Sequence, residues 1–448
     1  MPLSAALPSH EAYYDPAGSG KCFFVRNKRN SFIAVSGADY RRMLKGAGLS
    51  HETGDDEALS EVDSMINTIQ TDNDVDYAGP LAGHPCGSYD VEGKRVLVTV
   101  GAKHIDPMPG SWLCLEQLFR GLLIPLDDVE SVGESQLWTF YSWLKVALVS
   151  FRANKRRPGQ VMVIAGPPAC GKSLVQNLIT KMFGNRSAKP YQFLSGATQF
   201  NSDLFHAEHL MIEDETASFD LRVRRALGAN LKGLVVNDSQ RCHPKGREGL
   251  TLFPIWRVSI TLNDEAESLM VLPPLDESLQ DKLMLFRAYK REMPMPTETL
   301  EEWGAFSDQL IADLPGFIYY LLHTWQIPTD MTDSRYGVTH FHHPDLLAMM
   351  NVLSPETKLL ELIDVRLFPP GVIDPDFWEG RAAQLETELT GPNSSVSYEA
   401  RKLLIFNSAC GQYLGRLLHL HPHRISKRIS EGYVYWKIQP PAPTPAAV

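Results

Sequence analysis

The stretch VMVIAGPPACGKSLVQNLI, residues 161–179, constrains the fold of this chain more than any other. Its apolar run breaks into a loop that fits the pattern G-x-x-x-x-G-K-[ST] and then resumes as apolar residues at helical spacing. Glycines let backbone N–H groups converge on phosphate oxygens, and the following helix points its positive end at the same anion. The stretch therefore predicts a strand, a phosphate-binding loop and a helix within an α/β domain.

The loop also predicts a nucleotide site residue by residue. Lys172 is expected to place its ammonium on the β- and γ-phosphates of ATP, and Ser173 to bind Mg²⁺. The residues expected to surround the phosphates are Gly166, Pro167, Pro168, Ala169, Cys170, Gly171, Lys172, Ser173 and Leu174. ATP and Mg²⁺ are therefore the predicted cofactors.

Two later segments are predicted strands that end in polar residues. HLMIEDE, residues 209–215, is an apolar run ending in acids, so Asp214 is expected to hold Mg²⁺ and Glu215 to act as general base. WRVSITLND, residues 256–264, ends near Asn263, whose amide is expected to hold the attacking water or sense the γ-phosphate. With MVIA and PYQFL as further strand candidates, the alternation of strands and helices favours a parallel sheet.

Between these strands, LKGLVVNDSQRCHPKGREGL at residues 231–250 predicts a hairpin with a basic tip. Clustered Lys and Arg side chains bind the phosphates of nucleic acids. The residues expected to contact DNA are Lys232, His243, Lys245 and Arg247. A solvated basic loop is the alternative interpretation.

The remaining patterns divide the chain into regions. Two hairpins are predicted near the start, turning around residues 28–30 and at Glu92-Gly93, and the run 136–151 predicts a helix. The predicted regions are a small α+β unit (1–60), an α+β and helical collar (61–155), the P-loop ATPase (156–295), a helical region (296–385), a winged-helix-like domain (386–439) and a Pro/Ala-rich tail (440–448). In the winged-helix-like domain, HPHRISKRI is expected to form the recognition helix and YVYWKI the wing, so that Arg424, Lys427 and Arg428 meet phosphates. An accessory domain that packs on its neighbours is the alternative.

Composition limits the class of protein. The chain has 448 residues and a formal net charge of −10, so a nucleic-acid site must be a local basic patch. Its six cysteines are scattered without a CxxC pair, which favours a reduced, cytoplasmic setting. The most apolar long segment, 137–151, is too short to span a bilayer and contains Lys145, so no membrane association is expected.

Taken in order, GPPACGKS, LMIEDE, the basic hairpin and SITLN resemble the motifs of superfamily 3 helicases, and more narrowly the helicase part of phage and poxvirus-type primase–helicases. The resemblance implies an α/β, AAA+-like P-loop ATPase core with an N-terminal α+β region and a C-terminal helical, winged-helix region. It also implies an ATP-dependent DNA helicase of a prophage or other mobile element that works in replication as a homo-oligomeric ring around DNA, usually a hexamer. In that family Lys172 and Ser173 would be the Walker A pair, Asp214 and Glu215 the Walker B acids, and Asn263 sensor 1. Lys245, with His243, would grip DNA in the central channel.

The chain departs from the family pattern in two places. The expected position of the arginine finger holds Lys282, and lysine is a poorer bidentate ligand for phosphate than arginine. Arg287 is the nearest alternative, and Arg224 or Arg225 are others. Residues 1–150 show no acidic triad or zinc-binding cysteine set, so a separate primase or loading protein is an expected partner.

A second function remains open on the sequence alone. The same phosphate-loop residues would serve an ATP-switched oligomeric ATPase in defence or regulation that does not unwind DNA. The basic hairpin distinguishes the two, because only the motor requires it to hold DNA.

Overall fold

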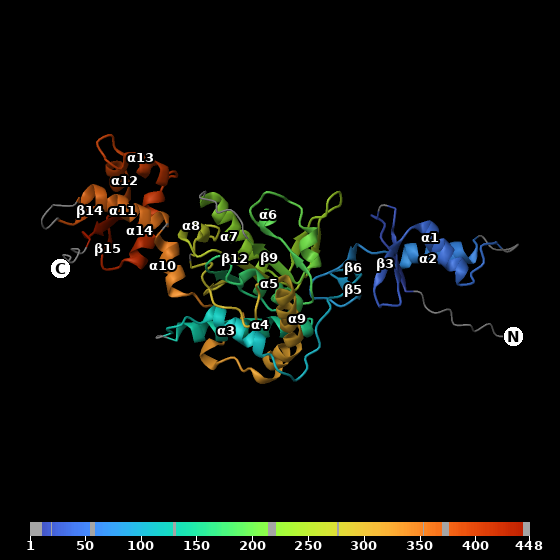
Figure 1. Cartoon of the computed structure of the whole chain (residues 1–448). Coiled ribbons are helices and arrows are strands. Elements are labelled where there is room, and N and C mark those ends of the chain that lie inside the picture. The colour runs from blue at the N-terminus through green and yellow to red at the C-terminus, as the bar shows by residue number, and fades with distance from the viewer. Residues whose placement is uncertain are drawn as a thin grey trace. The chain divides into compact units, whose positions relative to one another are not determined.

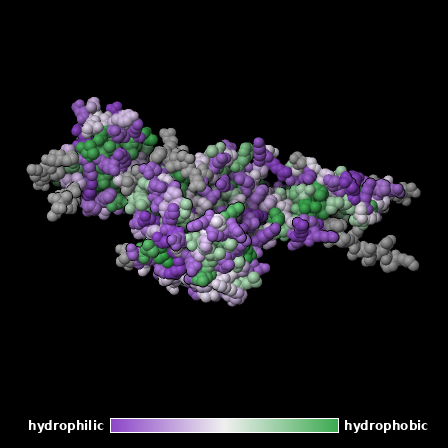
Figure 2. Space-filling model, viewed as in Figure 1, coloured by the Kyte–Doolittle hydropathy of each residue, from purple (hydrophilic) through white to green (hydrophobic). Residues whose placement is uncertain are grey.

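A computed structural model describes residues 11–18, 20–53, 59–128, 131–213, 221–275, 277–352, 354–369 and 376–441, without the side chains of residues 221–223, 225, 351 and 352 (Figure 1). The chain forms two compact units. The first comprises Met1–Asp264 and Val271–His343, and the second comprises Glu265–Met270 and Pro344–Val448. Hydrophilic side chains predominate on the face that Figure 2 shows, with smaller hydrophobic groups among them.

The centre of the first unit is a parallel sheet of five strands in the order β13-β7-β12-β9-β8. The strands are β7 (Val161–Ala165), β8 (Ser187–Ala188), β9 (His209–Glu213), β12 (Arg257–Leu262) and β13 (Leu283–Arg287). The strands β7 and β12 are buried along their whole length, as expected for a parallel sheet covered on both faces. The predicted parallel α/β sheet is thereby confirmed.

Two details of that sheet differ from the sequence prediction. PYQFL is not a strand: Tyr191–Leu194 forms the short helix α6, whose N-cap is Pro190. Proline lacks the N–H that a central strand needs, and the edge strand lies just before it at β8. The run LMLF forms the fifth strand, β13, which was not predicted because a short apolar run has no periodicity of its own.

The longer helices that accompany the central sheet are α3 (Leu113–Leu123), α4 (Val132–Arg152), α5 (Lys172–Met182), α7 (Leu221–Val236) and α9 (Leu300–Tyr319). The last of these ends in the π-helical turn η2 (Tyr320–Thr324), and two short 3-10 turns are η1 (Ser202–His206) and η3 (Thr329–Met331). One hydrophobic cluster joins side chains of α3, α4, α5 and α9 to β7 and β13. Within the described ranges, none of the helices is both long and apolar enough to cross a membrane.

The N-terminal part of the first unit holds two small sheets. The strands β1 (Ala12–Tyr14), β2 (Phe23–Arg26) and β3 (Phe32–Val35) are antiparallel and pack with the helices α1 (Gly37–Gly46) and α2 (Glu61–Asp72). The second sheet has the order β4-β6-β5, from β4 (Tyr77–Gly79), β5 (Gly87–Val91) and β6 (Lys94–Val98). Both predicted hairpins are confirmed, with Asn30, Glu92 and Gly93 at positive φ in the turns.

The second unit is helical with a three-stranded sheet. Its helices are α8 (Ala266–Leu269), α10 (Pro344–Val352), α11 (Pro355–Leu367), α12 (Ala382–Thr390), α13 (Ser397–Leu403) and α14 (Ala409–Leu420). Its antiparallel sheet has the order β14-β16-β15, from β14 (Trp378–Gly380), β15 (Ile425–Ser430) and β16 (Tyr433–Ile438).

The expected recognition helix over HPHRISKRI is wrong, because its second half is the strand β15. The turn Glu431-Gly432, with both residues at positive φ, favours a hairpin. The strand partner YVYWKI is rich in β-branched and aromatic residues, as the sequence predicted for that segment. Lys427 and Arg428 therefore lie on a strand rather than on a helix, and Arg424 lies in the turn just before that strand.

Candidate nucleotide-binding site

The loop between β7 and α5 has the backbone of a phosphate cradle. Ala169 and Gly171 both adopt positive φ, at 56° and 103°, and Gly171 is the N-cap of α5. A side chain on Gly166 would lie 2.5 Å from the carbonyl oxygen of Ala288, so only glycine lets the loop pass the end of β13. The first N–H groups of α5 therefore face a loop without a side-chain cap, which suits an anion.

Lys172 lies inside this loop. Its ammonium donates hydrogen bonds to the carbonyl oxygens of Gly166 and Pro167, each at 2.8 Å. It also lies 3.4 Å from Oδ1 of Asn263. Because β12 pairs with β7 in parallel, the ends of the two strands meet at one edge of the sheet, and the predicted pair Lys172 and Asn263 is brought together.

Buried polar contacts fix the register between α5 and β12. The Gln176 side chain donates to Oγ of Ser259 at 2.8 Å and accepts from Oγ1 of Thr261 at 3.0 Å. Both partners lie on β12, two to four residues before Asn263. The helix that follows the phosphate loop is therefore held in register with the strand that leads to Asn263.

The Cys170 side chain is buried within the phosphate loop. Burial raises the pKa of its thiol, so the thiol stays neutral near pH 7 despite the Lys172 ammonium 3.9 Å away. This environment does not favour a reactive thiolate.

The acids expected on the neighbouring strand, Asp214 and Glu215, lie outside the described residues. The strand that leads to them, β9, ends at Glu213 and pairs with β12 in parallel. Glu213 forms an ion pair with the exposed Lys189, 3.5 Å away.

A cleft of 1360 Å³ opens over the loop. One wall consists of the phosphate loop residues 168–174 with Asn177, Thr261 and Asn263. The opposite wall was not predicted: it consists of residues 291–298 with Glu302 and Trp303 at the start of α9. The methyl group of Met293 lies 3.4 Å from where a side chain on Gly171 would begin. The segment MPMPTE has no helical or strand period, so only its position after β13 could have indicated this wall.

The candidate arginines occupy different environments. Arg287 ends β13 beside β7, lies 3.9 Å from Oδ2 of Asp264 and packs over the ring of Tyr289. It therefore lies at the same sheet edge as the phosphate loop of its own chain. Lys282 is buried and pairs with the partly exposed Asp281, 2.5 Å away, and Arg224 is buried and donates to the carbonyl of Leu272. The side chain of Arg225 is outside the described part.

The predicted basic hairpin is present. The strands β10 (Gln240–Cys242) and β11 (Leu250–Leu252) are antiparallel, and the tip between them exposes His243, Lys245 and Arg247. Asn201 anchors its base: the Asn201 side chain donates to the carbonyl of Arg241 on β10 at 2.9 Å and accepts from the N–H of His243, where the tip begins, at 2.7 Å. Arg247 forms an ion pair with the buried carboxylate of Asp15 in the N-terminal part, at 2.8 Å. Lys232 is exposed on the helix α7 rather than on the hairpin.

The comparisons with known proteins support the fold. No protein-family model matches the chain, and no curated protein matches it. An apo structure of the NrS-1 C-terminal region is 13% identical, with a TM-score of 0.53 over 96% of this chain and 95% of that one. Its A form gives 13% identity and a TM-score of 0.52, over 96% of each chain. The chain therefore shares a mixed α/β fold with that region.

A more distant similarity is to SCCmec type IV Cch, described as an active helicase. It is 12% identical over 91% of this chain and 69% of that one, with a TM-score of 0.29. That score is too low to establish a common fold.

Proposed function

We propose that the chain is an ATP-dependent DNA helicase or translocase that acts as an oligomeric ring, in replication of a prophage or other mobile element. The observation that carries the proposal is Lys172, held within the phosphate loop 3.4 Å from Asn263, where both residues line an open cleft. The fit to a nucleotide phosphate rests on the positive-φ cradle and the uncapped start of α5.

In this proposal each residue of the cleft has a chemical role. Lys172 exchanges its two loop carbonyls for phosphate oxygens, and Ser173 and Asp214 hold Mg²⁺, which neutralises charge on the phosphates when bound. Glu215 accepts a proton from the attacking water, and Asn263 orients that water. Arg287 approaches the phosphates bound to its own chain, because it lies beside the end of β7. The arginine finger that a neighbouring subunit would supply is therefore unassigned.

The hairpin is the proposed contact with DNA. His243 and Lys245 are exposed at its tip, while its base is anchored through Asn201. A rigid base with an exposed basic tip suits the transfer of motion to a phosphate backbone.

The proposal is tested by separating hydrolysis from unwinding. Lys245→Ala is expected to keep basal ATP hydrolysis and to lose strand displacement on a forked duplex. Lys358→Ala, which removes an exposed lysine from α11 in the second unit, serves as the matched control and is expected to keep both. If DNA fails to stimulate ATP hydrolysis at low salt, the motor is rejected.

One observation favours the second function, an ATP-switched assembly that does not unwind DNA. The charge of Arg247 is already neutralised by Asp15 within the same chain, so part of the basic tip serves internal packing. In that case Lys245→Ala would change neither DNA affinity nor hydrolysis, and particle images with an ATP analogue would show assembly without dependence on DNA.

A further inference from the structure

One face of the C-terminal sheet combines aromatic rings with cations. Strand pairing places Arg428 beside Tyr435 and Lys437 beside Glu379, so these side chains share a face. The opposite face holds the buried Ile425, Trp436 and Ile438. We name the first surface the aromatic–basic face and define it by Phe377, Glu379, Arg381, Ser426, Arg428, Tyr433, Tyr435 and Lys437.

Each ring on this face lies against a cation. The Lys437 ammonium is 3.7 Å from the ring centre of Phe377, the Arg428 guanidinium 4.8 Å from that of Tyr435, and the Arg381 guanidinium 5.1 Å from that of Tyr433. Phe377 and Tyr433 are nevertheless 44% and 54% exposed. Large aromatic side chains that are exposed to solvent and held in position by cations indicate a surface that binds a ligand.

The charge of the face is positive although the chain is acidic overall. Among the described residues of β14, β15 and β16, Glu379 is the one carboxylate that faces this way, and it forms an ion pair with Arg428 at 2.7 Å. Three cations therefore outweigh one anion in a chain of net charge −10. The complementary ligand is an anion with aromatic groups.

The arginines on α14 and in the turn after it are engaged in ion pairs. On α14, Arg416 is paired with Glu356, and in the turn between α14 and β15 Arg424 donates to both oxygens of Asp364, at 2.7 and 3.1 Å. These cations hold the unit together, so a duplex groove would meet little free charge on the helix. On the sheet, Arg428 is exposed and Lys437 is partly exposed, while the helix α13 carries a further exposed cation, Lys402, 4.2 Å from the ring centre of Tyr398.

We propose that the aromatic–basic face binds single-stranded nucleic acid. Unpaired bases stack on Phe377, Tyr433 and the Arg428 guanidinium, and the backbone phosphates lie near Arg381 and Lys437. This site is distinct from the nucleotide cleft and from the β10–β11 hairpin, both of which belong to the other unit, and it requires no ATP hydrolysis.

The face provides matched pairs of variants for the test. Tyr433 and Val434 are adjacent and both exposed but point to opposite faces of β16, and Arg428 and Lys427 do the same on β15. All binding is measured with the full chain carrying Lys245→Ala, so that the proposed hairpin site contributes equally to every variant. The probe is a fluorescent oligothymidylate, followed by anisotropy at low and moderate salt.

Tyr433→Ala and Arg428→Ala are each expected to weaken oligothymidylate binding about tenfold, whereas Val434→Ala and Lys427→Ala change it less than about twofold. A 5-iodouracil oligonucleotide is expected to photo-crosslink to Tyr433 or Tyr435. Thermal melting checks that all four variants fold.

Two results would overturn the proposal. If duplex binds as tightly as the single strand, and Lys427→Ala weakens both as much as Arg428→Ala does, the contact is a non-specific or duplex one. If none of the four variants affects oligonucleotide binding, the face serves an acidic protein partner or none. ATP hydrolysis is unaffected in either case, so this failure is distinguishable from failure of the proposed motor.

Discussion

Polar side chains at the two ends of the strands of the central parallel sheet lie in opposite environments. We call the side of the sheet where the strands end the carboxyl edge, and the side where they begin the amino edge. At the carboxyl edge, β7 leads into the phosphate loop, β12 leads to Asn263, and β13 ends at Arg287. The phosphate loop and the Asn263 amide border an open cleft. At the amino edge, Glu208 before β9 and Arg257 at the start of β12 are buried. The first edge has polar groups that a ligand can reach, whereas Glu208 and Arg257 at the second are enclosed by the protein. We therefore expect substitutions at the carboxyl edge to change function and substitutions at the amino edge to change stability.

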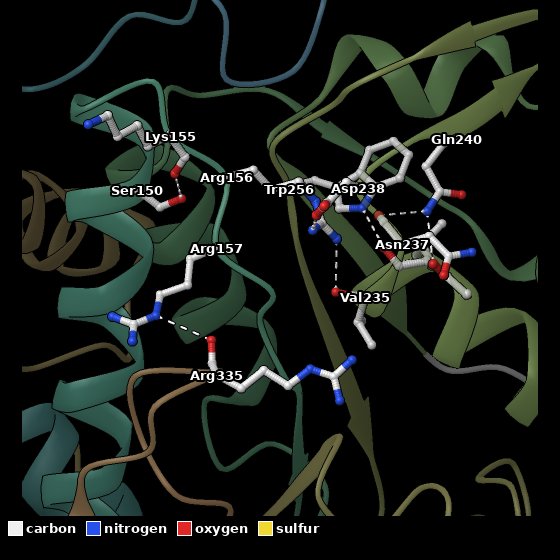
Figure 3. A network of polar contacts seen from close by, with 12 residues as sticks. Ser150, Lys155, Arg156, Arg157, Val235, Asn237, Asp238, Gln240, Trp256 and Arg335 are labelled. Atoms are coloured by element: carbon white, nitrogen blue, oxygen red, sulfur yellow. Dashed lines mark hydrogen bonds and ion pairs between the residues drawn. The ribbon is translucent and has the colours of Figure 1, made fainter.

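The amino edge is held by contacts from distant segments. Glu208 accepts from the N–H of Gly83 at 2.7 Å and from Nε of Arg186 at 2.8 Å. Figure 3 shows a second network of polar contacts. In it, Arg156 donates hydrogen bonds to Asp238 and to the Val235 carbonyl, and Arg157 donates to the Arg335 carbonyl.

Arg257, at the start of β12, lies in that region and donates to the carbonyl of Trp256. Burial, and then the charges of Arg156 and Arg157, lower its pKa to about 9. A buried cation close to two others is costly, so the enclosing contacts of this edge must offset it.

The largest effect is expected from Lys172→Ala at the carboxyl edge. Loss of the ammonium should reduce ATP turnover about 1000-fold, because the charge on the phosphates is no longer neutralised. Stability should change little, since Lys172 bonds to two carbonyls of its own loop and to Asn263. Phosphate release and thermal melting measure the two effects, and Lys181→Ala in the last turn of α5 is the control. A large fall in melting temperature would contradict the division between the edges.

Glu208→Ala tests the amino edge. It leaves Arg186 without its carboxylate in a largely buried site, so the free energy of unfolding should fall by about 3–5 kcal/mol. Nucleotide affinity of the folded fraction should not change. Chemical denaturation measures the loss, with Glu134→Ala as control, because its exposed ion pair with Arg120 contributes about 0–1 kcal/mol. Equal losses in the two variants would show that the amino edge is not special.

The difference between the edges also explains what the sequence could predict. The phosphate loop, β7 and the Asn-tipped β12 follow from local patterns, because each is a short run with its own signal. The amino edge has no such signal: Glu208 meets Gly83, 125 residues away, and its burial depends on that contact. For the same reason the second wall of the cleft was missed, since residues 291–298 acquire their role only by folding over the loop.

The β15–β16 hairpin shows a different limit of sequence-based prediction. RISKRIS has basic residues at helical as well as at strand spacing, and its pairing with YVYWKI decides for the strand. The basic character of the segment was predicted from the sequence, but the face on which each cation lies was not.

Asn263→Ala is expected to have the next largest effect at the carboxyl edge. Removing the amide should slow ATP turnover about 100-fold while nucleotide affinity falls much less, because the proposed role of the amide is to orient water rather than to bind phosphate. Single-turnover kinetics and nucleotide titration separate the two quantities. Asn177→Ala, on α5 in the same cleft, is the control. Equal losses of affinity and turnover would make Asn263 a binding residue instead.

The smallest effect concerns acid stability at the amino edge and depends on His209. This residue begins β9 and is fully enclosed, with Thr180 Oγ1 2.7 Å from Nδ1 and Ser259 Oγ 2.7 Å from Nε2. Burial lowers its pKa from 6.5 to about 3. Between these values the unfolded chain binds a proton that the folded chain does not, so this contribution to stability is complete above pH 6.5 and falls as pH drops toward 3.

The slope from one such residue is about 1.4 kcal/mol per pH unit. Denaturation of the wild type and of His209→Gln from pH 7 to pH 5 should therefore give curves that converge at low pH, because glutamine takes up no proton. His84, His104 and His206 also have lowered pKa values through burial, so the readout is the difference between the two curves rather than the wild-type slope. Parallel curves would show that His209 is protonated as easily in the folded as in the unfolded chain. The amino edge would then be open to water, and its contrast with the carboxyl edge would be lost.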